Sequence, residues 1–71
     1  SMENELTATE LQILRLICAD KSNAQIGQIM DIKLPTVKTH VSHILIKLDV
    51  SRRSEAKTAA KRLWLIPDDK N

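Results

Sequence analysis

The scarcity of turn-forming residues is the strongest constraint on the fold of this chain. Its 71 residues include one glycine and two prolines, whereas an all-β domain needs such residues at nearly every hairpin. So short a chain buries only about 60% of the surface that it exposes when unfolded, which excludes a second domain. Hydrophobic residues make up 42% of the chain, enough for one core and too many for intrinsic disorder. The sequence therefore predicts a single all-α domain.

A capping box at Thr7 and Glu10 predicts the start of the first helix. The threonine hydroxyl can accept a backbone N–H, and a glutamate three residues later can accept another from the capping residue. Apolar residues then recur at helical spacing and predict one buried face. That face consists of Ile13, Leu14, Ile17 and Cys18. Because Cys18 is the only cysteine, it cannot form an internal disulfide, and we expect a small buried side chain, not a nucleophile or a metal ligand.

A short helix and a longer helix are predicted next, with a tight connection between them. Ser22 or Asn23 can cap the short helix, which runs through Met30. The longer helix extends from about Leu34 to Leu48, with apolar residues at intervals of three and four that form an inward stripe. The stripe consists of Val37, Val41, Ile44 and Leu48. The outward row consists of Thr39, Ser42, His43 and Ile46.

Gly27 supports a close approach of these two helices. It is the only glycine and lies inside the short helix, where glycine costs about 1 kcal/mol relative to alanine. Its spacing from Val37 indicates a crossing that leaves no room for a side chain. A short helix, a tight turn and a longer helix with a polar outer face predict a helix-turn-helix, whose second helix can enter the major groove of DNA.

A fourth helix is predicted after Ser51 or Ser54, either of which can cap it. Its thin apolar seam consists of Ala56, Ala59, Ala60 and Leu63. We expect the domain to span residues 6–67, with residues 1–5 a cloning remnant and linker and residues 68–71 a polar tail. The apolar runs are far shorter than the roughly 20 residues of a membrane-spanning helix, and the N-terminus lacks the pattern of a signal peptide. A cytoplasmic protein is therefore expected.

Charge is divided unevenly along the chain. Residues 1–32 carry five acidic and two basic residues, a net charge of −3, and residues 33–62 carry two acidic and eight basic residues, a net charge of +6. A basic half attracts phosphate groups, although a charged helix face also keeps a protein in solution. Charge by itself leaves both interpretations open.

Five ordered blocks resemble the C-terminal DNA-binding domain of LuxR/GerE-type transcription regulators, the FixJ/NarL-like kind. The blocks are Leu6-Thr7-x-x-Glu10, Ser22-Asn23-x-x-Ile26, Thr36-Val37-Lys38-Thr39-His40-Val41, Lys47-Leu48-x-Val50 and Arg53-x-Glu55-Ala56. The resemblance covers residues 6 to about 66 and implies a four-helix domain that reads double-stranded DNA with its third helix and forms a homodimer through its fourth. It also implies an N-terminal sensory part in the full-length protein: a phosphoacceptor receiver, a small-molecule-binding domain or a larger nucleotide-dependent region.

The resemblance also implies roles for individual residues. The positions that match base-contacting residues are Lys38, Thr39 and Ser42, which the helical periodicity independently places on or beside the outward face. Lysine can donate to guanine, serine can donate or accept, and a threonine methyl can meet a thymine methyl. Contacts to the DNA backbone are expected from Asn23, Lys33, Thr36, His43, Lys47 and Arg52. Dimer contacts are expected from Ala56, Ala59, Ala60, Leu63 and Trp64.

Each of these roles has a structural alternative. Asn23 and Thr36 can act only as helix caps, and the basic residues can belong to a solvated helix face. Arg53 can form a structural pair with Glu10, which would link the first and last helices. Lys33 stands where relatives carry a serine cap, and it either gains from a nearby phosphate or is a tolerated poor cap.

Two further departures from the family pattern affect the helix ends. Relatives tend to carry glycine where this chain has Asp20, Asp49 and Trp64. Aspartate tolerates the left-handed conformation moderately and tryptophan poorly, so we expect the last turn to differ. Pro35 disfavours helical angles at Leu34, and the third helix is therefore expected to begin a residue late.

No enzymatic, metal or cofactor site is predicted. His40 and His43 lie three residues apart, but no third ligand has suitable spacing. The chain also lacks an acid pair, a thiol beside a base and a glycine-rich phosphate loop. One alternative function stays open, a helix-turn-helix descendant that binds another protein through Ile46, Trp64 and the alanine seam without reading DNA.

Overall fold

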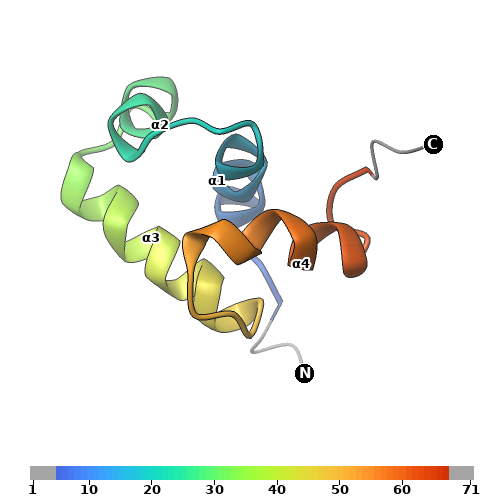
Figure 1. The fold of residues 1–71 in the computed structure, drawn as a ribbon. Helices are drawn as coiled ribbons and strands as arrows, with labels where there is room; N and C mark the ends of the chain where they lie inside the picture. The colour runs from blue at the N-terminus through green and yellow to red at the C-terminus, as the bar shows by residue number, and fades with distance from the viewer. Residues whose placement is uncertain (1–4, 68–71) are drawn as a thin grey trace.

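The computed structural model describes residues 5–67, which form four α-helices and one turn of 3₁₀-helix. The elements are α1 (Ala8–Cys18), α2 (Asn23–Met30), α3 (Leu34–Lys47), η2 (Arg53–Glu55) and α4 (Ala56–Arg62) (Figure 1). No residue in this range is in a β-strand, which confirms the prediction of an all-α fold with four helices. The expectations for residues 1–4 and for the tail 68–71 fall outside the described residues.

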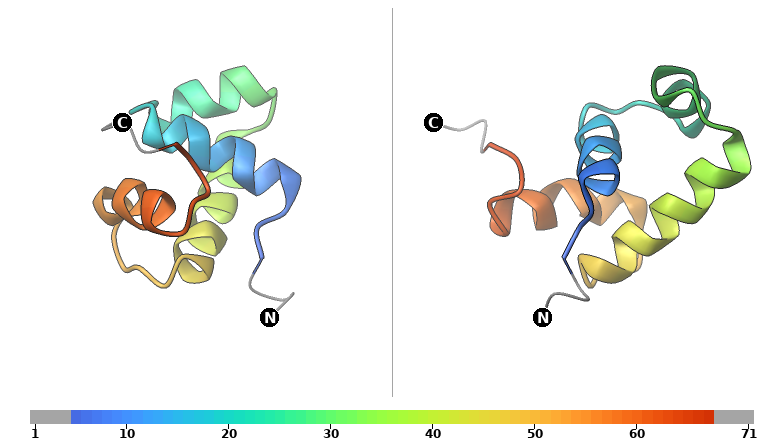
Figure 2. Two further views of the ribbon diagram at one scale, coloured as in Figure 1. Left: turned by 90° about the vertical axis from the view of Figure 1, so that its right-hand side faces the viewer. Right: turned by 180° about the vertical axis from the view of Figure 1, so that it is seen from behind.

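α1 lies at the centre of the domain and contacts each of the other three α-helices. Figure 2 shows it between α4 on one side and the α2–α3 pair on the other. The predicted apolar faces of α1 and α3 are buried together with Ile26 and three alanines of α4. The buried apolar side chains are Ile13, Leu14, Ile17, Cys18, Ile26, Val37, Val41, Ile44, Leu48, Ala56, Ala59 and Ala60. Cys18 is among them, which confirms the prediction of a small buried side chain, and burial raises the pKa of its thiol.

The predicted cap of α1 is confirmed, and α2 is capped in the same way. Thr7 Oγ1 accepts the Glu10 N–H at 3.1 Å, and Glu10 Oε1 accepts the Thr7 N–H at 2.9 Å. Ser22 and Gln25 form the equivalent pair at the start of α2. Of the two predicted alternatives, therefore, Ser22 and not Asn23 is the cap.

The predicted cap of the fourth helix is wrong. The backbone makes a 3₁₀ turn over Arg53–Glu55 before α4 begins, so neither Ser51 nor Ser54 occupies a capping position. The carboxylate of Glu55 accepts the backbone N–H of Ser51 at 3.3 Å and of Arg52 at 2.9 Å instead.

α3 begins at Leu34, so the predicted late start is also wrong. Lys33 is the N-cap and makes no side-chain capping bond. A proline in the first turn is compatible with a helix because the first backbone N–H groups have no partner within the helix. The first turn closes normally, with the Val37 N–H donating to the Lys33 carbonyl at 3.1 Å.

Each of the four helices is followed by a non-glycine residue in the left-handed conformation. Their φ angles are 63° at Asp20, 57° at Asp31, 59° at Asp49 and 62° at Trp64. The expected difference in the last turn does not occur, because Trp64 donates to the Lys61 carbonyl and Leu65 to the Ala60 carbonyl, in the pattern that also ends α1 and α3. Leu65 and Ile66 pack against the core, and this packing holds the tryptophan backbone in place.

Replacing Trp64 with glycine is expected to raise the free energy of unfolding by about 1 kcal/mol. The left-handed conformation costs a residue with a Cβ about 1–2 kcal/mol, and glycine avoids this cost. Part of the gain is offset because glycine has more conformational entropy in the unfolded state. The side chain is 90% exposed, so little packing is lost. Urea unfolding measures the change, and Arg62→Gly, at the last residue of α4, is the control expected to destabilise.

Candidate nucleic-acid interface

The outward face of α3 carries the three residues that were predicted to contact bases. Lys38, Thr39 and Ser42 are exposed, whereas Val37 and Ile44 on the opposite side are 0% exposed. The Thr39 hydroxyl donates to the Pro35 carbonyl at 3.1 Å, so its hydrogen is engaged, while its oxygen can still accept and its methyl group can still meet a ligand. The predicted orientation of the helix is therefore confirmed, and the base contacts themselves stay a prediction.

The distance between α2 and α3 depends on Gly27. A Cβ added to this residue would lie 2.9 Å from the Ile32 carbonyl oxygen and 3.5 Å from Val37 Cγ2. The predicted close approach to Val37 is confirmed, but the tightest obstacle is the backbone of the turn. The chain folds back there because Asp31 is left-handed and the Ile32 N–H donates to the Gly27 carbonyl at 2.9 Å.

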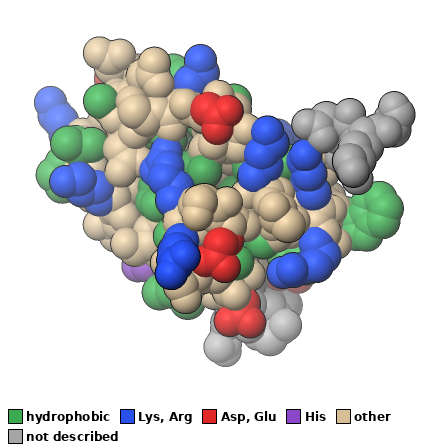
Figure 3. All heavy atoms as spheres, viewed as in Figure 1, with side chains coloured by type: hydrophobic (Ala, Val, Ile, Leu, Met, Phe, Trp, Pro, Cys, Tyr) green, Lys and Arg blue, Asp and Glu red, His purple; other side chains and the backbone are tan. Residues whose placement is uncertain are grey.

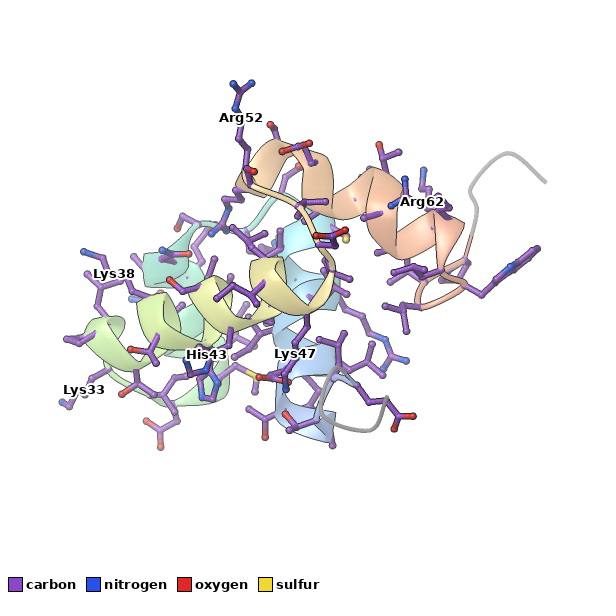
Figure 4. The ribbon with its side chains drawn as sticks, turned by 90° about the horizontal axis from the view of Figure 1, so that it is seen from below. Lys33, Lys38, His43, Lys47, Arg52 and Arg62 are labelled. Atoms are coloured by element: carbon purple, nitrogen blue, oxygen red, sulfur yellow. The ribbon has the colours of Figure 1, made fainter. Side chains whose placement is uncertain are left out.

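Basic side chains outnumber acidic ones on the face of the molecule in Figure 3. Lys33 and Lys38 project outward at the start of α3, and Arg52 projects outward near η2 (Figure 4). Thr36 and His43 are also exposed on α3, while Asn23 is half-buried. A phosphate group can therefore reach these side chains, and their contacts with the DNA backbone stay a prediction.

Lys47 has a structural role that the sequence did not predict, because its half-buried side chain pairs with a residue of α1. Its Nζ lies 2.7 Å from Glu10 Oε1 and 3.2 Å from the carbonyl oxygen of Glu5. Glu10 is only 4% exposed. Burial raises the pKa of Glu10, but the hydrogen bonds and charge of Lys47 and the hydrogen bonds of Thr7 lower it by more, so the net pKa lies below the ordinary value of 4.5. Lys47 thus links α3 to α1, and its predicted contact with the DNA backbone stays a prediction.

The predicted pair of Arg53 with Glu10 is also wrong. The Arg53 guanidinium reaches the start of α2 instead, where Nη1 donates to Asn23 Oδ1 and Nη2 donates to the Lys21 carbonyl oxygen at 2.6 Å. A guanidinium has a planar fork of donors that suits two neighbouring acceptors. The link therefore joins the segment before α4 to the start of α2, and not the first helix to the last as predicted.

Comparison with known proteins identifies the family. The profile described as bacterial regulatory proteins, luxR family, matches residues 4–60. The chain belongs to the LuxR family. The transcriptional regulatory protein LiaR of Bacillus subtilis is 49% identical over 61 residues, which are 86% of this chain and 29% of LiaR. The response regulator protein VraR of Staphylococcus aureus is 49% identical over 51 residues, 72% of this chain and 24% of VraR. The chain spans less than a third of the length of these relatives.

Membership in the LuxR family makes the chain a helix-turn-helix domain of the DNA-binding transcription regulators. Residues 5–67 hold no group of three His, Cys, Asp or Glu side chains that could bind a metal ion. Over the same range, the helices are too short or too polar to cross a membrane.

The predicted dimer surface of the LuxR-family domain is reduced by the burial of its alanines. Ala56 and Ala60 are 0% exposed and Ala59 is 1% exposed, because all three pack against the domain's own core. Their side chains are therefore not available to a second protein. Leu63 and Trp64 are 47% and 90% exposed, and their contacts to a partner stay a prediction.

Sequence reasoning missed the true partners of Glu10 and Arg53. The spacing of Glu10 with the buried face of α1 is a signal that could have indicated a buried carboxylate in need of a cation. Helical periodicity gives no distance between separate helices, so it could not choose between the two basic residues, Lys47 and Arg53. Only the crossing of α1 and α3 brings Lys47 to the carboxylate.

Proposed function

We propose that this LuxR-family domain binds double-stranded DNA sequence-specifically, with α3 in the major groove. The observation that carries the proposal is the division of α3 into a buried aliphatic side and an exposed side with Lys38, Thr39 and Ser42. The 14 residues of α3 span about 21 Å, and the major groove is wide enough to admit an α-helix.

The three exposed residues offer different chemistry to base edges. Lys38 donates to guanine O6 or N7, and the Thr39 methyl contacts a thymine methyl while its hydroxyl hydrogen stays bound to the Pro35 carbonyl. Ser42, one turn further along, donates or accepts. Together these residues favour readout of a mixed sequence over a purely electrostatic contact.

Phosphate contacts would set the register of the helix in the groove. Lys33 and Thr36 lie at the start of α3, where unpaired backbone N–H groups and the helix dipole favour an anion. His43, Arg52 and Asn23 are the remaining candidates. A nearby phosphate group would then explain why a lysine, which makes no side-chain capping bond, occupies the N-cap position of α3.

In the full-length protein, we propose a sensory domain N-terminal to this module and a homodimer that binds a two-part DNA site in the cytoplasm. The relative VraR is named a response regulator, which supports a receiver as the sensory part. Leu63 and Trp64 at the end of α4 are the proposed dimer contacts, because both are exposed and apolar.

A protein-interaction module is the second candidate function. Ile46 is 73% exposed on the outward side of α3, and an exposed apolar side chain there suits a protein partner. Titration of labelled random duplex at low salt separates the two functions. DNA binding requires affinity that falls steeply with salt, because Lys and Arg displace counterions, whereas an interaction module shows no such binding.

Selection of bound duplexes from a random pool tests the proposal directly, and Lys38→Ala tests the assigned readout. A symmetric consensus is expected from the selection. Lys38→Ala should cost about 1–3 kcal/mol on the selected duplex and much less on random duplex, since a base contact is lost. The control Arg52→Ala should weaken both duplexes alike and reduce the salt slope by about one. Equal weakening of both duplexes by Lys38→Ala contradicts the assignment.

A further inference from the structure

Arg53 restricts the orientation of the Asn23 side chain. Its Nη1 donates to Asn23 Oδ1 while its Nη2 donates to the Lys21 carbonyl oxygen at 2.6 Å. A guanidinium has donors and no acceptor, so the Asn23 atom that faces it must be the amide oxygen. The amide cannot rotate by half a turn without placing its own N–H groups against the Arg53 donors. The Nδ2 donors are therefore directed away from Arg53.

Asn23 lies between Arg53 and the beginning of α3. It lines a hollow of about 880 Å³ together with Arg53 and Lys57, and a second hollow of about 380 Å³ together with Lys33 and Leu34. The second hollow borders the N-terminal end of α3, where a phosphate contact is proposed. Asn23 lines both hollows, so it lies next to Arg53 on one side and next to the beginning of α3 on the other.

We propose that Arg53 is a positioning residue for DNA binding, which holds the Asn23 amide so that its N–H groups donate to a phosphate oxygen. This inference rests on the proposed function. A phosphate oxygen only accepts hydrogen bonds, so an amide that presents its oxygen would repel the phosphate. Arg53 takes up that oxygen and leaves the donors for the ligand.

Arg53 itself is not the phosphate ligand in this arrangement. It is half-buried, and the two donors that it directs at Asn23 and Lys21 are taken by acceptors of the domain, so the proposal gives the phosphate contact to Asn23. Its neighbour Arg52 is exposed and projects away from the domain (Figure 4). The two adjacent arginines therefore have distinct roles, and Arg52 serves as the matched control.

A double-mutant cycle on a labelled mixed-sequence duplex tests the inference, because phosphate contacts do not depend on the operator. The variants are N23A, R53Q, R53K and the doubles of N23A with each Arg53 variant, and circular dichroism checks that each is folded. N23A and R53Q should each weaken binding by about tenfold, as expected for a hydrogen bond to a charged group. Each double variant should bind no worse than N23A, because both changes remove the same contact. If R53Q does not fold, R53K replaces it in the double-mutant cycle. Lysine keeps the positive charge of Arg53 but lacks the planar fork of donors.

The salt slope separates positioning from direct contact. R53Q should leave the salt slope unchanged, because the phosphate contact that it disrupts is made by the neutral amide of Asn23. R52A should reduce the slope by about one, and the fold-losses in affinity of R52A and N23A should multiply when the two changes are combined. The inference is overturned if R53Q reduces the slope by about one, if the losses of N23A and R53Q multiply, or if either single variant binds like the unsubstituted chain. Failure of the unsubstituted chain to show salt-dependent binding would overturn the proposed function as well, and is recognised before any variant is made.

N23D distinguishes binding from stability. The carboxylate still offers an acceptor to Arg53, so the unfolding midpoint should be kept or raised. Binding should nevertheless fall further than in N23A, because the donors are replaced by an anion that repels phosphate. Binding of N23D equal to that of the unsubstituted chain would show that Asn23 faces no phosphate and would overturn the inference.

Discussion

Replacing Lys47 with methionine is expected to lower the free energy of unfolding by about 3 kcal/mol near pH 7. The Lys47 ammonium lies 2.7 Å from Glu10 Oε1, and Glu10 is 4% exposed. Methionine preserves most of the aliphatic stem but leaves the buried carboxylate without its cation. Urea unfolding measures the loss. The control Lys57→Met removes an exposed lysine of α4 and should change the free energy of unfolding by less than about 0.5 kcal/mol.

The pH dependence of this loss identifies its cause. In the unsubstituted protein the pKa of Glu10 is below its ordinary value of 4.5, so the pair contributes stability above that value and loses it as the pH falls through the folded-state pKa. Without Lys47, the pKa of Glu10 rises because a hydrogen bond and a charge that lower it are lost, and the penalty of the buried carboxylate disappears once the carboxyl is protonated. The difference between the two proteins should therefore shrink from about pH 7 to about pH 4. An equal difference at both pH values would show that lost packing, not charge, is responsible.

Replacing Gly27 with valine is expected to cost about 3 kcal/mol of unfolding free energy. The new Cβ would lie 2.9 Å from the Ile32 carbonyl oxygen, a backbone atom of the turn that cannot move aside without opening the α2–α3 connection. Its methyl groups would also press on Val37, which is 0% exposed. Thermal or urea unfolding measures the effect.

The neighbouring residue Gln28 provides the control for this substitution. It is exposed on the same helix, so Gln28→Val introduces the same side chain without a clash and should cost only about 0.5 kcal/mol of helix propensity. Equal losses in the two variants would show that valine in α2, and not the close approach to the turn, is destabilising. A protein with Gly27→Val that stays folded should also bind DNA more weakly, because α2 supports the position of α3.

Local patterns in the sequence predicted most of the fold. The apolar spacing of α1 and α3, the capping box at Thr7 and the lone Gly27 each depend on residues a few positions apart, so helical geometry alone relates them. The same geometry predicted which side of α3 carries Lys38, Thr39 and Ser42. Family resemblance added the expected roles of those residues, which stay predictions.

Tertiary structure alone decided which charged and small side chains meet. The sequence does not distinguish Lys47 from Arg53 as the partner of Glu10. The crossing of α1 and α3 brings Lys47 within ion-pair distance of the Glu10 carboxylate. The alanines of α4 were equally suited to a core or to an interface, and the packing of α4 on α1 buries them. Trp64 takes the left-handed conformation because the packing of Leu65 and Ile66 outweighs its local preference. These outcomes depend on distances between separate helices, which no periodicity along the chain contains.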